Sequence, residues 1–279
     1  MRCDRCASWA ALAAALVVSA SISAGADAMK YPDWKGQWNR IGGGGQWDPT
    51  KPGGRGQAPP LTPEYQAIWE SHLQEQAAGG QSYNTRVRCM PGGMPRMMVA
   101  YNPMEIIVTP ETTYVAISFD SEFRRIYTDG RDWPKEVEPT YAGYSIGQWI
   151  ATRGDGQNDE LDVETRHMKG PRIFEPSGIP LHQDNQTVVE ERLFLDSGDP
   201  DTLHDEITTI DHALTRPWTV TRSYKRDRKG VWIDEVCAEA NQYVILGNQT
   251  YLMSLDGYLM PVAKDQPPPD LRYFKQPAK

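Results

Sequence analysis

The chain has 279 residues, a formal net charge of −8 and a pI near 5.2. It carries no Lys/Arg stripe to neutralise phosphates, which excludes a nucleic-acid partner. Its length suits one large β domain or two small ones, and its composition favours one.

The first 28 residues predict a cleaved signal peptide. Arg2 and Arg5 precede an apolar run over 7–18, and Ala26-Asp27-Ala28 is typical of a cleavage site. The run is too short for a membrane span, and we expect no span elsewhere. The sequence therefore predicts an exported protein that starts near Met29.

Export would leave two cysteines in the mature chain. Removal of the leader takes away Cys3 and Cys6, so Cys89 and Cys237 remain in an oxidising compartment. Two thiols there most simply form a disulfide, and two separately buried thiols are the alternative.

Residues 29–95 are predicted to form an N-terminal wrap with one helix. The stretch 31–60 is rich in Gly, Pro and Trp, and we expect it to follow a surface. Its expected anchors are Trp34, Trp38 and Trp47. Thr62 and Pro63 then form a helix start, and apolar residues recur at helical spacing, which predicts a helix over 63–78.

From residue 96 to 262 the pattern changes to short β-branched and aromatic runs between turn residues. The predicted strands lie at 96–101, 104–109, 112–120, 123–128, 144–151, 160–168, 186–195, 203–211, 217–226, 231–237 and 243–246, with a hairpin near 250–260. Their spacing favours an all-β fold, an antiparallel lipocalin/calycin-like barrel that forms a single domain with the wrap. Residues 263–279, which include Pro267-Pro268-Pro269, should be an extended tail.

Alternation along these strands predicts polar side chains inside the barrel, because successive residues point to opposite faces. The inward polar and aromatic set comprises Thr165, His167, Thr187, Glu191, Asp205, Thr209, Asp211, Trp218 and Arg222. A buried Glu191 needs a cation, for which Arg222 or Arg192 is the available choice. The pair is either structural or orients a ligand.

The histidines show no spacing that is typical of a metal site, so the sequence favours none. His182 lies in a loop with Asp184, and a carboxylate beside an imidazole can hold it as a general base. Asp211 and His212 form a second such pair. Structural hydrogen bonding is the alternative for both pairs.

Two predicted turns contain glycine and charged residues. The segment 154–159 predicts a hairpin turn and is too short for an EF-hand. Tyr127 ends a strand before a Gly turn, across which Asp129 and Arg131 are expected to pair, either to lock the loop or to form a pocket rim. The chain has no G-x-S-x-G elbow and no dinucleotide-binding loop.

Several motifs resemble those of a large group of exported bacterial proteins usually called hypothetical. They are Arg88-Cys89-Met90-Pro91, Gly93-Met94-Pro95-Arg96, Met104-Glu105-Ile106, the run from Arg124 to Arg131, Gly143-Tyr144-Ser145-Ile146-Gly147, Val163-Glu164-Thr165, His182, Glu191-Arg192 and the run from Ile207 to Asp211. The resemblance implies a proteobacterial, periplasmic setting. Gly36-Gln37-Trp38 is also similar to the G-x-W that opens lipocalin-type barrels. Many relatives carry Asp-Pro where this chain has Asp211-His212.

Two functions are predicted from different classes. The first is a cofactor-independent, metal-independent lyase or isomerase that acts on a small hydrophobic molecule. Aromatic, lignin-derived compounds are the expected class of substrate. Its expected catalytic residues are His182, Asp211 and Glu191, and its expected substrate-binding residues are Tyr127, Asp129, Arg131, His167, Arg222 and Trp218. The second is a lipocalin-like carrier, and a structural envelope protein is a third interpretation. The number of inward acids favours catalysis, and the oligomeric state is left open.

Overall fold

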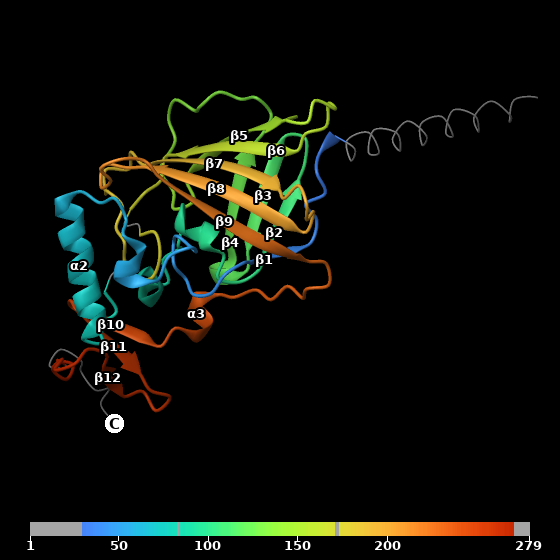
Figure 1. Cartoon of the computed structure of the whole chain (residues 1–279). Coiled ribbons are helices and arrows are strands. Elements are labelled where there is room, and N and C mark those ends of the chain that lie inside the picture. The colour runs from blue at the N-terminus through green and yellow to red at the C-terminus, as the bar shows by residue number, and fades with distance from the viewer. Residues whose placement is uncertain (1–29, 83, 171–172, 271–279) are drawn as a thin grey trace, which may run out of the picture.

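The computed structural model describes residues 30–82, 84–170 and 173–270. The predicted signal peptide over 1–28 and the end of the predicted tail, 271–279, lie outside these ranges. Within them, nine strands close into a barrel, so the all-β barrel prediction is confirmed (Figure 1). The strands are β1 (Gln37–Arg40), β2 (Met104–Val108), β3 (Thr112–Ile117), β4 (Glu122–Tyr127), β5 (Tyr144–Ile150), β6 (Glu160–Arg166), β7 (Val188–Leu195), β8 (Thr202–Ile210) and β9 (Trp218–Asp227).

The barrel is not antiparallel throughout, and here the sequence-based prediction is wrong. β4 and β5 pair in parallel, with Ile126 opposite Ser145 and Tyr127 opposite Ile146. A parallel connection needs a crossover of a dozen or more residues, and the stretch 128–143 supplies it. Lipocalin barrels have eight antiparallel strands, so this barrel differs from them in strand number and in one pairing.

Two of the predicted strands are not strands in the structure. The run 96–101 contains a 3-10 helix, Arg96–Val99, whose four residues are buried. A short apolar run cannot be assigned to strand or buried helix from its pattern alone. The run 231–237 forms no strand and leads into the short helix α3 (Cys237–Ala240).

The end of the chain also departs from the prediction that the barrel extends to residue 262. β10 (Tyr243–Leu246), β11 (Gln249–Met253) and β12 (Leu259–Pro261) form a separate three-stranded sheet. β1, which lies in the predicted wrap, completes the barrel by pairing with both β2 and β9.

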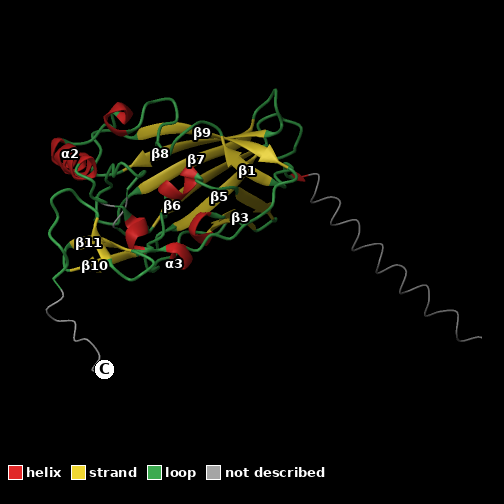
Figure 2. Ribbon diagram, turned by 90° about the horizontal axis from the view of Figure 1, so that it is seen from below, coloured by secondary structure: helices red, strands yellow, loops and turns green. Residues whose placement is uncertain are grey.

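The helix α2 (Pro63–Ala77) lies beside the barrel, as Figure 2 shows, and matches the predicted range 63–78. Thr62 caps it, since its Oγ1 accepts a hydrogen bond from the Tyr65 backbone N–H at 3.4 Å. Its buried Trp69 donates from Nε1 to Ser177 Oγ at 3.2 Å, which fixes the helix to the loop before β7. Within the described residues, every helix is too short or too polar to cross a membrane.

The barrel interior is a packed core, closed at each end by aromatic rings. At one end Trp34 packs against Trp149, with ring centroids 4.9 Å apart. At the other end Phe174 lies 5.0 Å from Trp218 and 5.1 Å from Trp47. The predicted wrap anchors Trp34, Trp38 and Trp47 are all fully buried. Barrels of about this size are filled by their own side chains, and this one follows that rule.

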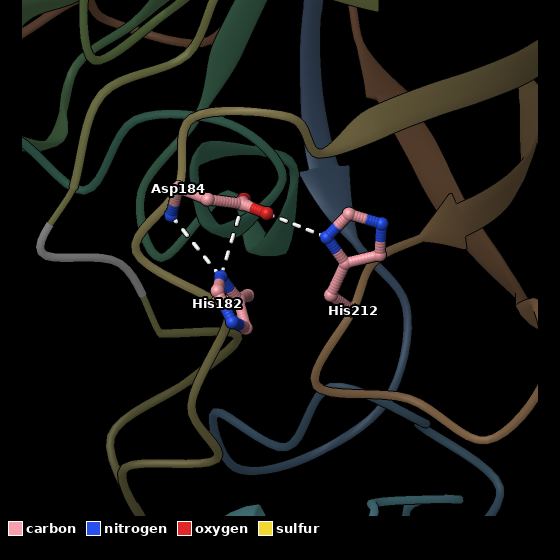
Figure 3. A group of neighbouring side chains, drawn as sticks. All are labelled: His182, Asp184 and His212. Atoms are coloured by element: carbon pink, nitrogen blue, oxygen red, sulfur yellow. Dashed lines mark hydrogen bonds and ion pairs between the residues drawn. The ribbon is translucent and has the colours of Figure 1, made fainter.

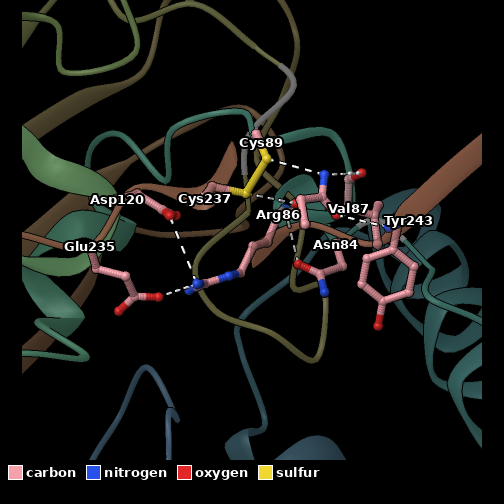
Figure 4. The surroundings of a disulfide bond; sticks show 9 residues. Asn84, Arg86, Val87, Cys89, Asp120, Glu235, Cys237 and Tyr243 are labelled. Carbon is pink, nitrogen blue, oxygen red and sulfur yellow. Dashed lines mark hydrogen bonds and ion pairs between the residues drawn. A yellow bond between two sulfur atoms is a disulfide. The ribbon is translucent and has the colours of Figure 1, made fainter. Parts of the chain in front are cut away.

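The predicted disulfide between Cys89 and Cys237 is present, with Cα atoms 5.4 Å apart (Figure 4). It joins the segment between β1 and β2 to α3. Arg86, near the first cysteine, forms an ion pair with Glu235, and Asn241 donates to the Val87 carbonyl oxygen at 3.4 Å. The bridge therefore ties two segments that lie far apart in the sequence.

Glu122, at the start of β4, gives the first testable prediction. Its carboxylate accepts hydrogen bonds from the backbone N–H groups of Gly92 and Gly93, yet burial raises its pKa from 4.5 to about 7. The unfolded chain then gives up this proton at lower pH than the folded chain does, so the free energy of unfolding should fall as pH rises from about 4.5 to about 7.

We expect Glu122→Gln to lack this pH-dependent loss and to be more stable than the parent at pH 8 by on the order of 2 kcal/mol. Urea unfolding at pH 5 and pH 8 measures it, with Glu111→Gln at an exposed site as the control. Equal pH dependence in parent and Glu122→Gln would contradict the raised pKa.

Candidate functional site

A buried ion pair lies at the centre of the barrel. Arg124 on β4 donates from Nη1 and Nη2 to the two carboxylate oxygens of Glu191 on β7, at 2.8 and 2.5 Å. The two side chains are 1% and 0% exposed. Arg124 also donates to Ser145 Oγ at 3.0 Å and to Thr165 Oγ1 at 2.7 Å. Four motifs noted in the sequence thus meet in one hydrogen-bond network.

The prediction that Glu191 is buried is confirmed, but the predicted partner is wrong. Arg192 lies on the outer face, where it pairs with Glu206 at 2.7 Å. Arg222 is buried and donates to the backbone carbonyl oxygens of Gln46 and Trp47, at 3.0 and 2.5 Å. The actual partner comes from across the barrel and not from a neighbouring strand.

Asp205, opposite Arg222 on the next strand, is another buried acid of the barrel interior. It is fully buried, and neither of its carboxylate oxygens has a hydrogen-bond partner among the described residues. Loss of hydration, together with the nearby charge of Glu191, raises the pKa of Asp205 well above its usual value. Asp205 therefore lies without a hydrogen bond among the described residues, beside an ion pair whose hydrogen bonds are made, and both belong to the packed interior of the barrel.

Three of the four residues in the two predicted His/Asp pairs form a single cluster, which we call the rim cluster: His182, Asp184 and His212 (Figure 3). Val188, at the start of β7, lies opposite Ile210, at the end of β8. The loop before β7 and the loop after β8 therefore lie at the same end of the barrel. Asp184 contacts both imidazoles, with Oδ2 2.5 Å from His212 Nδ1 and Oδ1 3.2 Å from His182 Nδ1.

Asp211 fixes the positions of the two loops that carry the rim cluster. Its carboxylate accepts hydrogen bonds from the His182 and Ala213 backbone N–H groups, both at 2.8 Å, and from Thr187 Oγ1 at 2.5 Å. It is nearly buried, at 8% exposure. Asp211 was predicted to be catalytic, but its contacts describe a brace between the loops.

The rim cluster is open to solvent. The side chains of His182, Asp184 and His212 are 34%, 21% and 62% exposed. Partial burial works to raise the pKa of Asp184, but hydrogen bonds from the Gln186 backbone N–H and from His212 outweigh it, so the pKa lies below its usual value. Two imidazole nitrogens and a carboxylate oxygen lie within 4.8 Å of one another. Nitrogen and oxygen atoms of these kinds are common ligands of metal ions.

Tyr65 at the start of α2 lies beside the rim cluster, with its ring centroid 5.4 Å from that of His182. Burial and the charge of Glu64 raise the pKa of its hydroxyl group. Tyr65 therefore remains a hydrogen-bond donor at neutral pH.

The remaining predicted site residues lie elsewhere. The turn pair is present, with Arg131 Nη2 2.6 Å from Asp129 Oδ2, and the Arg131 guanidinium covers the Tyr127 ring at 3.8 Å. His167 was expected inside the barrel, but it follows the end of β6 and packs 6.2 Å from Trp133, outside the strand alternation. Trp218 belongs to the buried aromatic closure.

Arg131 and Trp133 line a groove of about 930 Å³ on the outer face of β5 to β8. Tyr31 and Trp149 contribute further aromatic surface to its lining. The residues of its floor are mostly charged or polar: Gln148, Asp162, Glu164, Glu190, Arg192, Glu206 and Thr208. The groove thus combines aromatic walls with charges of both signs.

No known protein-family profile matches this chain, and no curated protein matches it either. The resemblance noted from the motifs remains a prediction. Arg124 is the main residue that sequence reasoning missed. It shares the inward face of β4 with Ile126, so the alternation that identified Glu191 was sufficient to find it.

Proposed function

We propose that this protein is an exported, periplasmic enzyme of the lyase or isomerase type, with the rim cluster as its reactive centre. The observation that carries the proposal is the convergence of His182, Asp184 and His212 from two loops onto one solvent-accessible point. The disulfide supports export, because such bonds persist in oxidising compartments.

The proposed reaction removes a proton from a small hydrophobic molecule, for which an aromatic, lignin-derived compound is the expected class. Nitrogen and oxygen lone pairs that meet at an accessible point provide what proton abstraction requires. Tyr65 can donate a hydrogen bond to an oxygen of the substrate from the same side. In this proposal Asp211 positions the loops and Glu191 stabilises the core, and neither transfers a proton.

The test is a screen of the purified mature chain against aromatic monomers and dimers, with mass spectrometry of bound and released compounds. We expect turnover that falls about 100-fold or more in His212→Ala and in Asp184→Asn. His204→Ala is the matched control, because His204 also faces a carboxylate, Asp196, at 3.1 Å, but lies on the outer wall. Turnover that the rim variants leave unchanged would refute the assignment.

A lipocalin-like carrier is the second candidate, and the outer groove is the observation that favours it. The packed barrel interior argues against an internal ligand of the lipocalin kind. A carrier would release the bound compound chemically unchanged in the same screen, and the rim variants would bind it as the parent does.

A further inference from the structure

We infer that the rim cluster is a binding site for one divalent transition-metal ion of the zinc class, held by the imidazoles of His182 and His212 and the carboxylate of Asp184. The inference concerns the same residues as the proposed function: an ion bound there would occupy the lone pairs to which that proposal assigns proton abstraction, so zinc should change any turnover. Binding of the ion itself can be tested without any substrate.

The distances between the donor atoms fit a single ion. The carboxylate oxygens of Asp184 lie 2.5 Å from His212 Nδ1 and 3.2 Å from His182 Nδ1, and the three donors lie within 4.8 Å of one another. Tetrahedral bonds of roughly 2.0–2.2 Å to zinc place neighbouring donors about 3.3–3.6 Å apart. The contact from Asp184 to His182 is already near this separation, whereas the shorter contact to His212 has to widen when the ion binds.

The donor set selects the kind of metal. Two imidazoles and one carboxylate suit Zn²⁺ and other late divalent ions of the first row. Ca²⁺ needs six to eight oxygen ligands and Mg²⁺ an octahedral set of oxygens and waters, neither of which two imidazoles favour. We therefore expect zinc to bind and calcium and magnesium not to compete.

The surroundings provide the outer support that metal ligands require. Asp211 holds the His182 backbone at 2.8 Å, and the Gln186 backbone N–H donates to Asp184 Oδ1 at 3.0 Å. Asn185, between these residues, adopts the left-handed backbone conformation at φ 60°, which Asn tolerates better than most residues. The solvent side is open, since His212 is 62% exposed, so a bound ion would keep positions for water or substrate.

Some contacts must be exchanged when the ion binds. The hydrogen bond between His212 and Asp184 is replaced by two bonds to the metal, and the weak contact from the Asp184 backbone N–H to His182 Nδ1, at 3.2 Å, is lost.

The experiment uses the tag-free mature chain after treatment with EDTA and its removal. Calorimetric titration with ZnCl₂ should show one equivalent bound with a dissociation constant in the micromolar range or tighter, and Co²⁺ should give the visible absorption of a site with nitrogen ligands. His212→Ala and Asp184→Ala should each weaken binding at least tenfold, and His204→Ala should bind as the parent does. The absence of stoichiometric binding, or equal affinity in His212→Ala, would overturn the inference.

The two proposals can fail separately. Zinc binding by the rim cluster without turnover of any compound would support the metal site and contradict the enzyme. Turnover by the EDTA-treated protein that added zinc does not change would support the enzyme and contradict the role of the metal. Thermal unfolding of each variant without metal shows whether its fold is intact.

Discussion

Replacement of Arg124 by methionine is expected to lower the free energy of unfolding by about 3–5 kcal/mol, the largest effect of any single substitution considered for this chain. The guanidinium donates hydrogen bonds to both carboxylate oxygens of Glu191, and both side chains are buried. Methionine would leave a buried carboxylate without its cation, and would also remove the donors to Ser145 and Thr165. Urea unfolding followed by circular dichroism measures the loss.

Two further variants test whether the loss comes from the unpaired buried charge. The double variant Arg124→Met/Glu191→Leu removes both charges, so it should recover most of the lost stability, because a well-packed apolar pair often replaces a buried ion pair without cost. Arg192→Met is the matched control: Arg192 is one residue from Glu191, but its ion pair with Glu206 is exposed and should contribute less than about 1 kcal/mol. An Arg124→Met variant as stable as Arg192→Met would refute the structural role of the pair.

Local alternation was sufficient to predict which side chains enter the barrel. On β7 the residues Val189, Glu191 and Leu193 are buried while Glu190 and Arg192 are exposed, as the period of two predicts. On β8 and β9, Asp205 and Arg222 are likewise inside, and Asp211, which directly follows β8, is nearly buried. The faces of these strands are fixed by the sequence itself, since a shift by one residue would expose the whole apolar set.

Pairing across the barrel could not be obtained in the same way. Arg124 and Glu191 are 67 residues apart, and they meet because the parallel step between β4 and β5 sets the position of β4 against the rest of the barrel. No local pattern encodes that step. For the same reason β1 was assigned to the wrap, although its Trp38 pairs with β2 and β9.

The residues of the rim cluster could be predicted from the sequence, but their convergence could not. Each His/Asp pair was visible as neighbours in the chain, but the two pairs became one site only through the register of β7 against β8. The separation of 30 residues between His182 and His212 matches no short metal-binding spacing, so pattern searches pass over it.

The double substitution Cys89→Ser/Cys237→Ser is expected to lower the free energy of unfolding by about 4 kcal/mol. The bond joins residues 148 positions apart, and closure of so long a loop restricts the unfolded chain strongly. The parent treated with a reducing agent should lose the same stability, which distinguishes loss of the bond from the effect of serine. Because the bridge lies outside the barrel, the segments it ties, 84–89 and 235–241, should become accessible to protease before the strands do.

The disulfide and the buried ion pair should also act independently, since they share no contacts. The loss in a triple variant with Arg124→Met, measured under conditions where the protein still folds, should then equal the sum of the separate losses within about 0.5 kcal/mol. An unchanged unfolding midpoint in Cys89→Ser/Cys237→Ser would contradict the predicted loss of stability. It would mean that other contacts hold the two segments together, among them the ion pair of Arg86 with Glu235.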